Sequence, residues 1–160
     1  MIEKFPVDSR IWIFQNNRKF TFDEEKIIKS ELSVFMNSWN AHGNNLTAGF
    51  EIKHNLFIIV AANENKEKAS GCSIDSLVNQ IKKIENLLDL RLLDRSLVSY
   101  FLTNNKEEIF VSTFFDFKKK IKSNQIVSNT FIFNNTVATL GDYLTNWIQP
   151  IQNSWAKIYF

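Results

Sequence analysis

Cysteine, glycine and histidine are scarce in this sequence, and each shortage excludes a kind of site. The single cysteine, Cys72, rules out an intrachain disulfide. One cysteine and two histidines cannot build a cysteine-rich zinc site, and no H-E-x-x-H motif occurs, so we expect no metal. The four glycines form neither G-x-x-x-x-G-K-[ST] nor G-x-G-x-x-G. We therefore expect no P-loop and no cofactor.

A strong charge of one sign and long apolar runs are absent as well. The 19 basic and 17 acidic residues leave a net charge of +2, which excludes a strongly basic nucleic-acid arm. The segment 53–60 lacks the signature of RNA-recognition modules, and we interpret the basic run at 118–122 as a solvated helix face. The apolar run from Leu56 to Ala62 is about a third of a membrane span, and no secretory signal precedes it. We expect a cytoplasmic protein without a membrane or nucleic-acid partner.

The residues that are present supply a core, since 44% are hydrophobic and 14% aromatic, with 15 phenylalanines. Thr21 and Glu24 form a capping-box pattern, and apolar residues then recur at helical spacing as far as Trp39. His42-Gly43 ends this helix, with Gly43 placed to act as a left-handed C-cap. The elements expected over residues 1–104 are strands at 10–15, 46–53, 56–62 and 97–102, with helices from Thr21 to Gly43 and from Ser70 to Leu88.

This order, β-α-β-β-α-β with a hairpin in the middle, is typical of the ferredoxin-like split βαβ fold. We therefore expect an α+β protein with a ferredoxin-like core at residues 1–104. Residues 105–160 follow without a Pro/Gly/Ser-rich linker and are expected to form a C-terminal mixed α/β extension in the same structural unit. The elements expected there are strands at 108–113 and 130–134, helices at 114–122 and 139–148, and a last segment at 152–159 after Pro150.

Two helices on one face of such a sheet leave the other face open. The first strand alternates Ile11 and Ile13 with Trp12 and Phe14, and the third strand is apolar throughout, so both faces require burial. We infer that the extension at 105–160, or a second copy of the chain in a homodimer, covers the open face.

Strand direction predicts where a site could form. The first helix ends, and the second begins, where the first strand starts, so Arg10, His42 and the segment Ser70-Gly-Cys-Ser-Ile-Asp75 are expected to meet. Cys72 would lie at or just before a helix N-terminus, where the dipole favours a thiolate and exposed amides can bind an anion. The candidate catalytic pair is Cys72 as nucleophile and His42 as base. The candidate ligand-binding residues are Arg10, Gly71, Ser73 and Asp75.

Each of these residues also has a purely structural interpretation. Cys72 can be a small buried core residue, as free cysteines often are. Asp75 can stabilise the second helix from its first turn, and His42 can satisfy the end of the first helix. His54, in the expected hairpin turn, is interpreted as solvated.

Five segments stand out as a group: Arg10–Gln15 (RIWIFQ), Trp39-x-Ala-His-Gly43, Ser70–Asp75 (SGCSID), Phe133-Asn-Asn135, and Pro150 with Ser154-Trp155. Together they resemble a family of small bacterial proteins that are often labelled "ABC transporter ATPase". The resemblance spans nearly the whole chain, favours one structural unit over residues 1–160, and implies no established activity. Because the chain lacks the phosphate-binding loop and its lysine, we expect that the label is mistaken and that this is not a P-loop ATPase.

The sequence thus supports two hypotheses about function. The first is a small-molecule or anion site at the Cys72 helix N-terminus. The second is a non-enzymatic interaction or oligomerisation module, suggested by four aromatic residues near the C-terminus, because exposed aromatics often contribute to interfaces. Those aromatics can equally cover the open sheet face; they are Trp147, Trp155, Tyr159 and Phe160.

Overall fold

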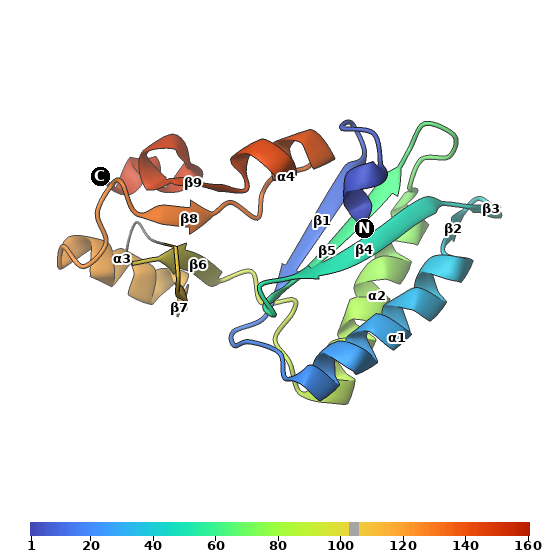
Figure 1. Cartoon of the computed structure of the whole chain (residues 1–160), viewed down its shortest axis with the longest axis horizontal. Helices are drawn as coiled ribbons and strands as arrows, with labels where there is room; N and C mark the ends of the chain where they lie inside the picture. The colour runs from blue at the N-terminus through green and yellow to red at the C-terminus, as the bar shows by residue number, and fades with distance from the viewer. Residues whose placement is uncertain (103–105) are drawn as a thin grey trace. The chain divides into compact units, whose positions relative to one another are not determined.

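The computed structural model describes residues 1–102 and 106–160, so the expected end of the fourth strand near Asn104, and the expected boundary between residues 104 and 105, lie outside the described residues. Within those ranges the protein is α+β, with four α-helices and antiparallel sheets (Figure 1). The chain divides into two compact units. The first comprises Met1–Leu93 and Ala138–Gly141, and the second comprises Asp94–Val137 and Asp142–Phe160.

The first unit contains a three-stranded sheet of order β1-β5-β4, formed by β1 (Arg10–Gln15), β4 (Thr47–Lys53) and β5 (Phe57–Asn63). Both pairings are antiparallel, so β5 lies between β1 and β4. Six of the seven residues of β5 are buried, in agreement with its apolar run.

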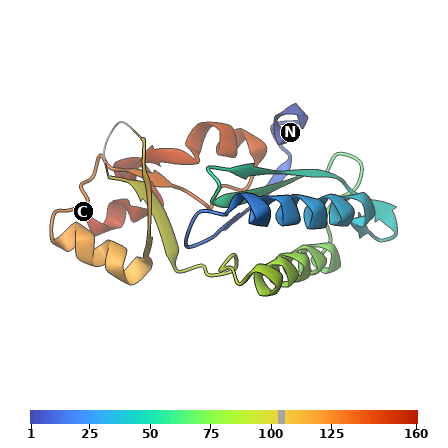
Figure 2. The ribbon, with the colours of Figure 1, turned by 60° about the horizontal axis from the view of Figure 1, so that its bottom comes forward.

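Helices α1 (Phe22–Ser38) and α2 (Gly71–Leu88) lie side by side on one face of this sheet (Figures 1 and 2). Alternate strand residues, which share one face, contribute to the core with them. On the opposite face, the N-terminal turn η1 (Ile2–Lys4) packs near β4, with Ile2 fully buried and the Phe5 ring close to Gly49. Covering of this face by residues 105–160 or by a second copy stays a prediction.

The strand order does not confirm a four-stranded ferredoxin-like sheet. The expected fourth strand, β6 (Leu97–Phe101), belongs instead to the second unit, where it pairs with β7 (Ile109–Thr113) and β8 (Phe131–Phe133). Its nearest partner along the chain is β7, and pairing with a sequence neighbour is the common outcome in antiparallel sheets. The outer edge of β1 is met by a distant segment, through an antiparallel bridge between Arg10 and Thr139 and a 2.9 Å hydrogen bond from the Ile11 N–H to the Ala138 carbonyl.

Two tight turns in the first unit differ in how well they were predicted. The hairpin turn at His54-Asn55 forms as expected, with φ angles of 54° and 52° at its central residues. The end of the first helix was placed too late. Helix α1 ends at Ser38, and His42-Gly43, with φ angles of 51° and 82°, connect the two short strands β2 (Asn40–Ala41) and β3 (Asn44–Asn45). Gly43 is left-handed as predicted, but in a hairpin turn rather than a helix cap.

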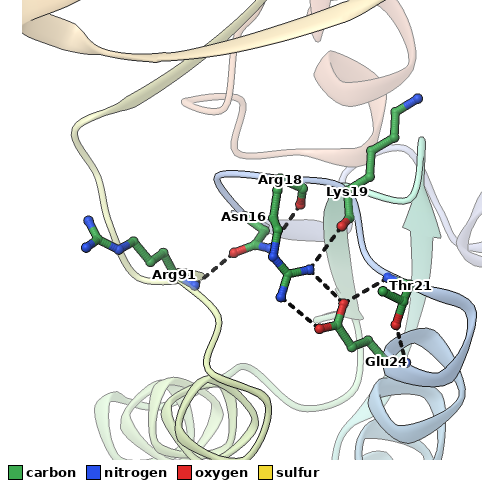
Figure 3. Close-up of polar contacts among 6 residues, drawn as sticks. All are labelled: Asn16, Arg18, Lys19, Thr21, Glu24 and Arg91. Atoms are coloured by element: carbon green, nitrogen blue, oxygen red, sulfur yellow. Dashed lines mark hydrogen bonds and ion pairs between the residues drawn. The ribbon is translucent and has the colours of Figure 1, made fainter.

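The start of α1 is held by a polar network (Figure 3). The predicted capping box is present, because the Thr21 hydroxyl accepts from the Glu24 N–H and the Glu24 carboxylate accepts from the Thr21 N–H. Arg18 donates two hydrogen bonds to the same carboxylate, at 2.9 and 2.8 Å. The fully buried Asn16 donates to the Arg18 carbonyl and accepts from the Arg91 N–H, which ties the chain after α2 to the turn before α1.

The second unit contains a four-stranded sheet of order β7-β6-β8-β9. Its strands besides β6 are β7 (Ile109–Thr113), β8 (Phe131–Phe133) and β9 (Ile148–Pro150). Its remaining elements are α3 (Phe114–Lys122), η2 (Ile151–Asn153) and η3 (Trp155–Tyr159). Helix α4 (Leu140–Asn146) begins with two residues of the first unit and continues in the second. The expected strands and helices are therefore present with shifted ends, and the last segment forms 3-10 turns.

Three of the four late aromatic residues are packed inside the second unit. The Trp155 ring lies 5.9 Å from Phe114, and Tyr159 lies 5.5 Å from the same ring. Trp147 contacts Phe133 and donates a 3.0 Å hydrogen bond from its indole to Asn135. Phe160 is 55% exposed. These aromatics thus give the interaction-module hypothesis little support, because core packing accounts for most of them.

Candidate functional site

The C-terminal end of α1 and the start of α2 are joined by one buried contact. The indole N–H of Trp39, the residue after α1, donates a 2.7 Å hydrogen bond to the Ser73 carbonyl in the first turn of α2. Arg10 is in register with Ala62 near the end of β5, so the start of β1 lies at the same end of the sheet. The start of β1, the end of α1 and the start of α2 therefore lie at one end of the first unit, and the Trp39–Ser73 hydrogen bond joins the last two.

Helix α2 begins with a capping box that was not predicted. The Ser70 hydroxyl accepts from the Ser73 N–H, and the Ser73 hydroxyl accepts from the Ser70 N–H at 2.6 Å. The usual signal is Glu or Gln at the third helical position, and here a serine takes that role. Ser73 is buried and its hydroxyl also donates to the Ser70 carbonyl, so the cap engages this candidate ligand-binding side chain fully.

Cys72 is the second residue of α2 and is exposed. The interpretation as a buried core cysteine is therefore wrong. Its own N–H and that of Gly71 point out of the first turn, and neither has a hydrogen-bond partner among residues 1–102 and 106–160. A thiol and two unpaired amides thus face solvent at the positive end of an 18-residue helix.

Asp75 lies one turn further along than expected. It is the fifth residue of α2, and the first turn contains no acidic residue. The predicted first-turn stabilisation by Asp75 is therefore wrong, because the helix starts at Gly71 rather than later. The consequence is that no carboxylate of the first turn offsets the helix dipole beside Cys72.

Arg10 and His42 make different contributions at this end of the sheet. The Arg10 guanidinium lies 4.9 Å from the Trp12 ring centre and 3.8 Å from the Glu64 carboxylate. His42 is exposed in the β2–β3 turn. It does not cap α1, which ends at Ser38, and within the described ranges no hydrogen bond joins its imidazole to the Cys72 thiol. The thiol–imidazole pair is thus not formed in this conformation.

His54, the other histidine, lies far along the chain from these groups in the turn between β4 and β5. Its side chain is exposed, as expected, and its ring lies 6.3 Å from the Phe57 ring. Partial desolvation, followed by the nearby charges of Lys53 and Lys19, lowers the pKa of His54. We assign it no part in the candidate site.

A polar cluster in the second unit was missed by sequence reasoning. The hydroxyl of the fully buried Tyr100 lies 2.8 Å from the Ser112 hydroxyl, and the Lys120 ammonium donates to both oxygens, at 2.9 and 3.3 Å. Lys120 follows the buried Phe117 by three residues, and that helical spacing was the available signal that it points inward. The solvated-face interpretation holds for the exposed Lys119 and Lys122 but not for Lys120. The Lys120 ammonium thus satisfies the hydroxyl oxygens of the buried Tyr100 and Ser112.

The described part of the chain contains no cluster of three or more histidine, cysteine, aspartate or glutamate side chains that could hold a metal ion. No described helix combines the length and apolar character needed to cross a membrane. Comparisons with protein-family models, with curated proteins and with solved structures found no significant match.

Proposed function

We propose that the chain binds a small anionic molecule at the start of α2. The observation that carries this proposal is the set of groups in the first turn: two unpaired N–H groups, an exposed thiol and no carboxylate. Backbone amides at a helix N-terminus, together with the dipole, form a favourable environment for phosphate, sulfate or carboxylate groups. The ligand class is therefore a small molecule that carries such a group.

Neighbouring groups support a site of limited size. The Trp39 indole fixes the β2–β3 hairpin beside α2, and Asn44 of that hairpin donates a 3.1 Å hydrogen bond to Glu67. The exposed His42 lies in the turn of the same hairpin. Arg10 adds positive charge at the same end of the sheet, although it is oriented by Glu64.

An enzymatic version of this proposal makes Cys72 a nucleophile with His42 as its base. It requires that the imidazole move to the thiol when the ligand binds. The binding version requires no such movement, so we favour binding. We also propose that the first unit retains a ferredoxin-like plan in which residues 138–141 take the place of the fourth strand, that the protein is bacterial, as the resemblance implies, and that it acts in the cytoplasm.

Alkylation of Cys72 by iodoacetamide at neutral pH tests the proposal. The matched control is a Cys72→Ser, Ser30→Cys chain, whose cysteine is equally exposed but lies in the middle of α1. A helix dipole worth about 0.3–1 kcal/mol favours the thiolate and slightly lowers its nucleophilicity, so we expect Cys72 to react about 1.3- to 2.5-fold faster than the control. Inorganic phosphate at millimolar concentration is expected to slow alkylation of Cys72 and to leave the control unchanged.

Equal rates for the two cysteines, with no effect of phosphate on either, would overturn the proposal. A His42→Ala chain separates the binding and enzymatic versions. An unchanged alkylation rate in that chain supports binding alone, whereas a clear loss of rate shows that the imidazole activates the thiol.

A further inference from the structure

The exposed edges of the two sheets differ in how they are protected against pairing with another chain. The outer edge of β1 is bridged by Thr139, β4 carries the charged residues Glu51 and Lys53, and β9 is short and ends at Pro150. Bridging segments, charges and prolines are the usual means by which edge strands avoid association. The fourth edge, that of β7, has none of them, since its sequence is Ile-Phe-Val-Ser-Thr.

The hydrogen-bonding groups of β7 that point away from β6 can be identified from the register. Thr113 is opposite Leu97, and the Phe114 N–H bonds to the Ser96 carbonyl, so residues 110 and 112 direct their backbone groups toward β6. The N–H groups of Ile109, Val111 and Thr113 therefore point outward. Within the described ranges none of these three has a hydrogen-bond partner, and the side chains of Ile109 and Val111 are half-buried.

The residues that flank β7 carry opposite net charge, with Lys106 beside the two glutamates on one side and Asp116 in the first turn of α3 on the other. The exposed Glu107 and Glu108 precede it, and neither carboxylate has an ion-pair partner in the described part of the chain. The lysines of α3, which begins directly after β7, follow it; those without an acidic partner there are Lys118, Lys119 and Lys122. Parallel pairing of two β7 strands would bring like charges together, whereas antiparallel pairing brings the acidic end of each strand beside the basic end of the other.

We propose that the β7 edge is a dimerisation surface on which two copies of this chain pair antiparallel about a twofold axis at Val111. In this register Val111 is opposite its symmetry mate and Ile109 is opposite Thr113, so the outward groups of both strands become hydrogen-bonded. The two four-stranded sheets of the second units join into one continuous sheet across the interface. The partner is a second copy because the charge pattern complements itself.

The interface is small, since five residues of each edge take part. Stable dimers usually bury about 800 Å² on each partner, so we expect a reversible dimer with a dissociation constant on the order of 10 µM. This proposal is independent of the site at Cys72, and either can fail without the other.

Sedimentation velocity of the full chain over a concentration series tests the association. The expected result is a shift from 18.7 kDa toward twice that mass as concentration rises. The charge test is Glu108→Lys, matched by Asp8→Lys, because both residues are exposed and both changes alter the net charge equally. We expect Glu108→Lys to raise the dissociation constant at least about tenfold and Asp8→Lys to leave it unchanged.

Crosslinking tests the register. In a Cys72→Ser background, Val111→Cys is expected to form a disulfide-linked dimer under mild oxidation, because paired Cα atoms in an antiparallel sheet lie about 5.5 Å apart and within disulfide reach. Thr47→Cys, on the edge of β4, is the control and is expected to stay monomeric. A wild-type chain that remains monomeric up to roughly 100 µM would overturn the proposal. So would a dimer that Glu108→Lys leaves unchanged and that Val111→Cys does not crosslink.

Discussion

The two long helices of the first unit begin with the same capping device and opposite electrostatics. At the start of α1, the Thr21–Glu24 box is accompanied by three acidic residues in the first turn and by Arg18 on the Glu24 carboxylate. At the start of α2, two serines form the box and the first turn contains no acid. The first arrangement places three carboxylates against the helix dipole, whereas the second has none in its first turn, and the Glu64 carboxylate accepts a hydrogen bond from the Ala69 N–H just before the cap.

This difference separates a helix start whose polar groups are used within the fold from one that leaves groups unpaired. The α1 start consumes its polar groups in contacts that hold the chain before and after it, including the buried Asn16 (Figure 3). The α2 start satisfies its cap with its own side chains and leaves two amides and a thiol for solvent.

The largest effect is expected from Trp39→Ala, which removes the contact between the end of α1 and the start of α2. Trp39 is 2% exposed and its indole satisfies the Ser73 carbonyl. Replacing a buried tryptophan with alanine lowers the free energy of unfolding by about 3–5 kcal/mol. We expect a loss of this size for Trp39→Ala in urea denaturation. Trp39→Phe retains part of the packing and should cost less. An Ala variant within about 1 kcal/mol of wild type would show that the two helix ends are held by other contacts.

The next effect concerns how the free energy of unfolding falls at acidic pH. The hydrogen bonds from Arg18 lower the pKa of Glu24 to about 2, from 4.5. Because the folded-state pKa lies below the unfolded one, this stabilisation is complete above about pH 4.5 and is lost as pH falls toward 2. Solvent screening limits it to about 1–2 kcal/mol. Glu24→Gln should remove that part of the pH dependence, and Asp23→Asn, in the same turn but more exposed, should leave it.

A smaller effect compares the caps directly. Ser70→Ala and Thr21→Ala each remove the side-chain acceptor of one box, at a cost of about 1 kcal/mol. We expect Thr21→Ala to cost less in urea denaturation, because Arg18 still holds Glu24 in place. A smaller loss for Ser70→Ala would contradict the view that α2 depends on its own side chains.

The smallest change in stability is expected from substitutions of Gly71, one of which gives the start of α2 an acidic first turn like that of α1. Gly71 is exposed, and a Cβ atom there would meet no atom within 4 Å, so substitution is sterically free. Gly71→Ala should stabilise by about 0.5–1 kcal/mol through backbone entropy, and Gly71→Glu by a few tenths more through the dipole. Gly71→Glu should also slow Cys72 alkylation relative to Gly71→Ala. Equal alkylation rates in the two variants would mean that first-turn charge does not act on the thiol.

The parts of this fold that sequence could predict are those set by neighbouring residues. The Thr21–Glu24 box, the His54-Asn55 turn and the apolar β5 depend on local spacing, and all three are present. The partner of β6 and the bond between Asn16 and Arg91 depend on which distant segments meet, and no local pattern encodes that. Gly43 is intermediate, because its left-handed backbone was predictable but its place in a hairpin was not.

In the candidate site, too, the features set by neighbouring residues could be predicted and the others could not. The position of Cys72 at a helix start followed from the apolar stripe behind it, and its exposure did not. The Ser70–Ser73 box was missed because serine replaces the acidic or amide residue that identifies such caps. The inward direction of Lys120 was hidden by its place in the basic run 118–122, although its spacing from Phe117 indicated it.

The bridge between Arg10 and Thr139 has a consequence for how the chain acquires its structure. Residues 138–141 belong to the first unit although the segment Asp94–Val137 of the second unit precedes them in the chain. During synthesis, the edge of β1 therefore stays uncovered until most of the second unit has been made. Contacts of such long sequence separation form slowly, and an open strand edge invites aggregation meanwhile. A chain shortened before residue 138 should accordingly express as aggregates, even though every strand of the first sheet is encoded in its first 63 residues.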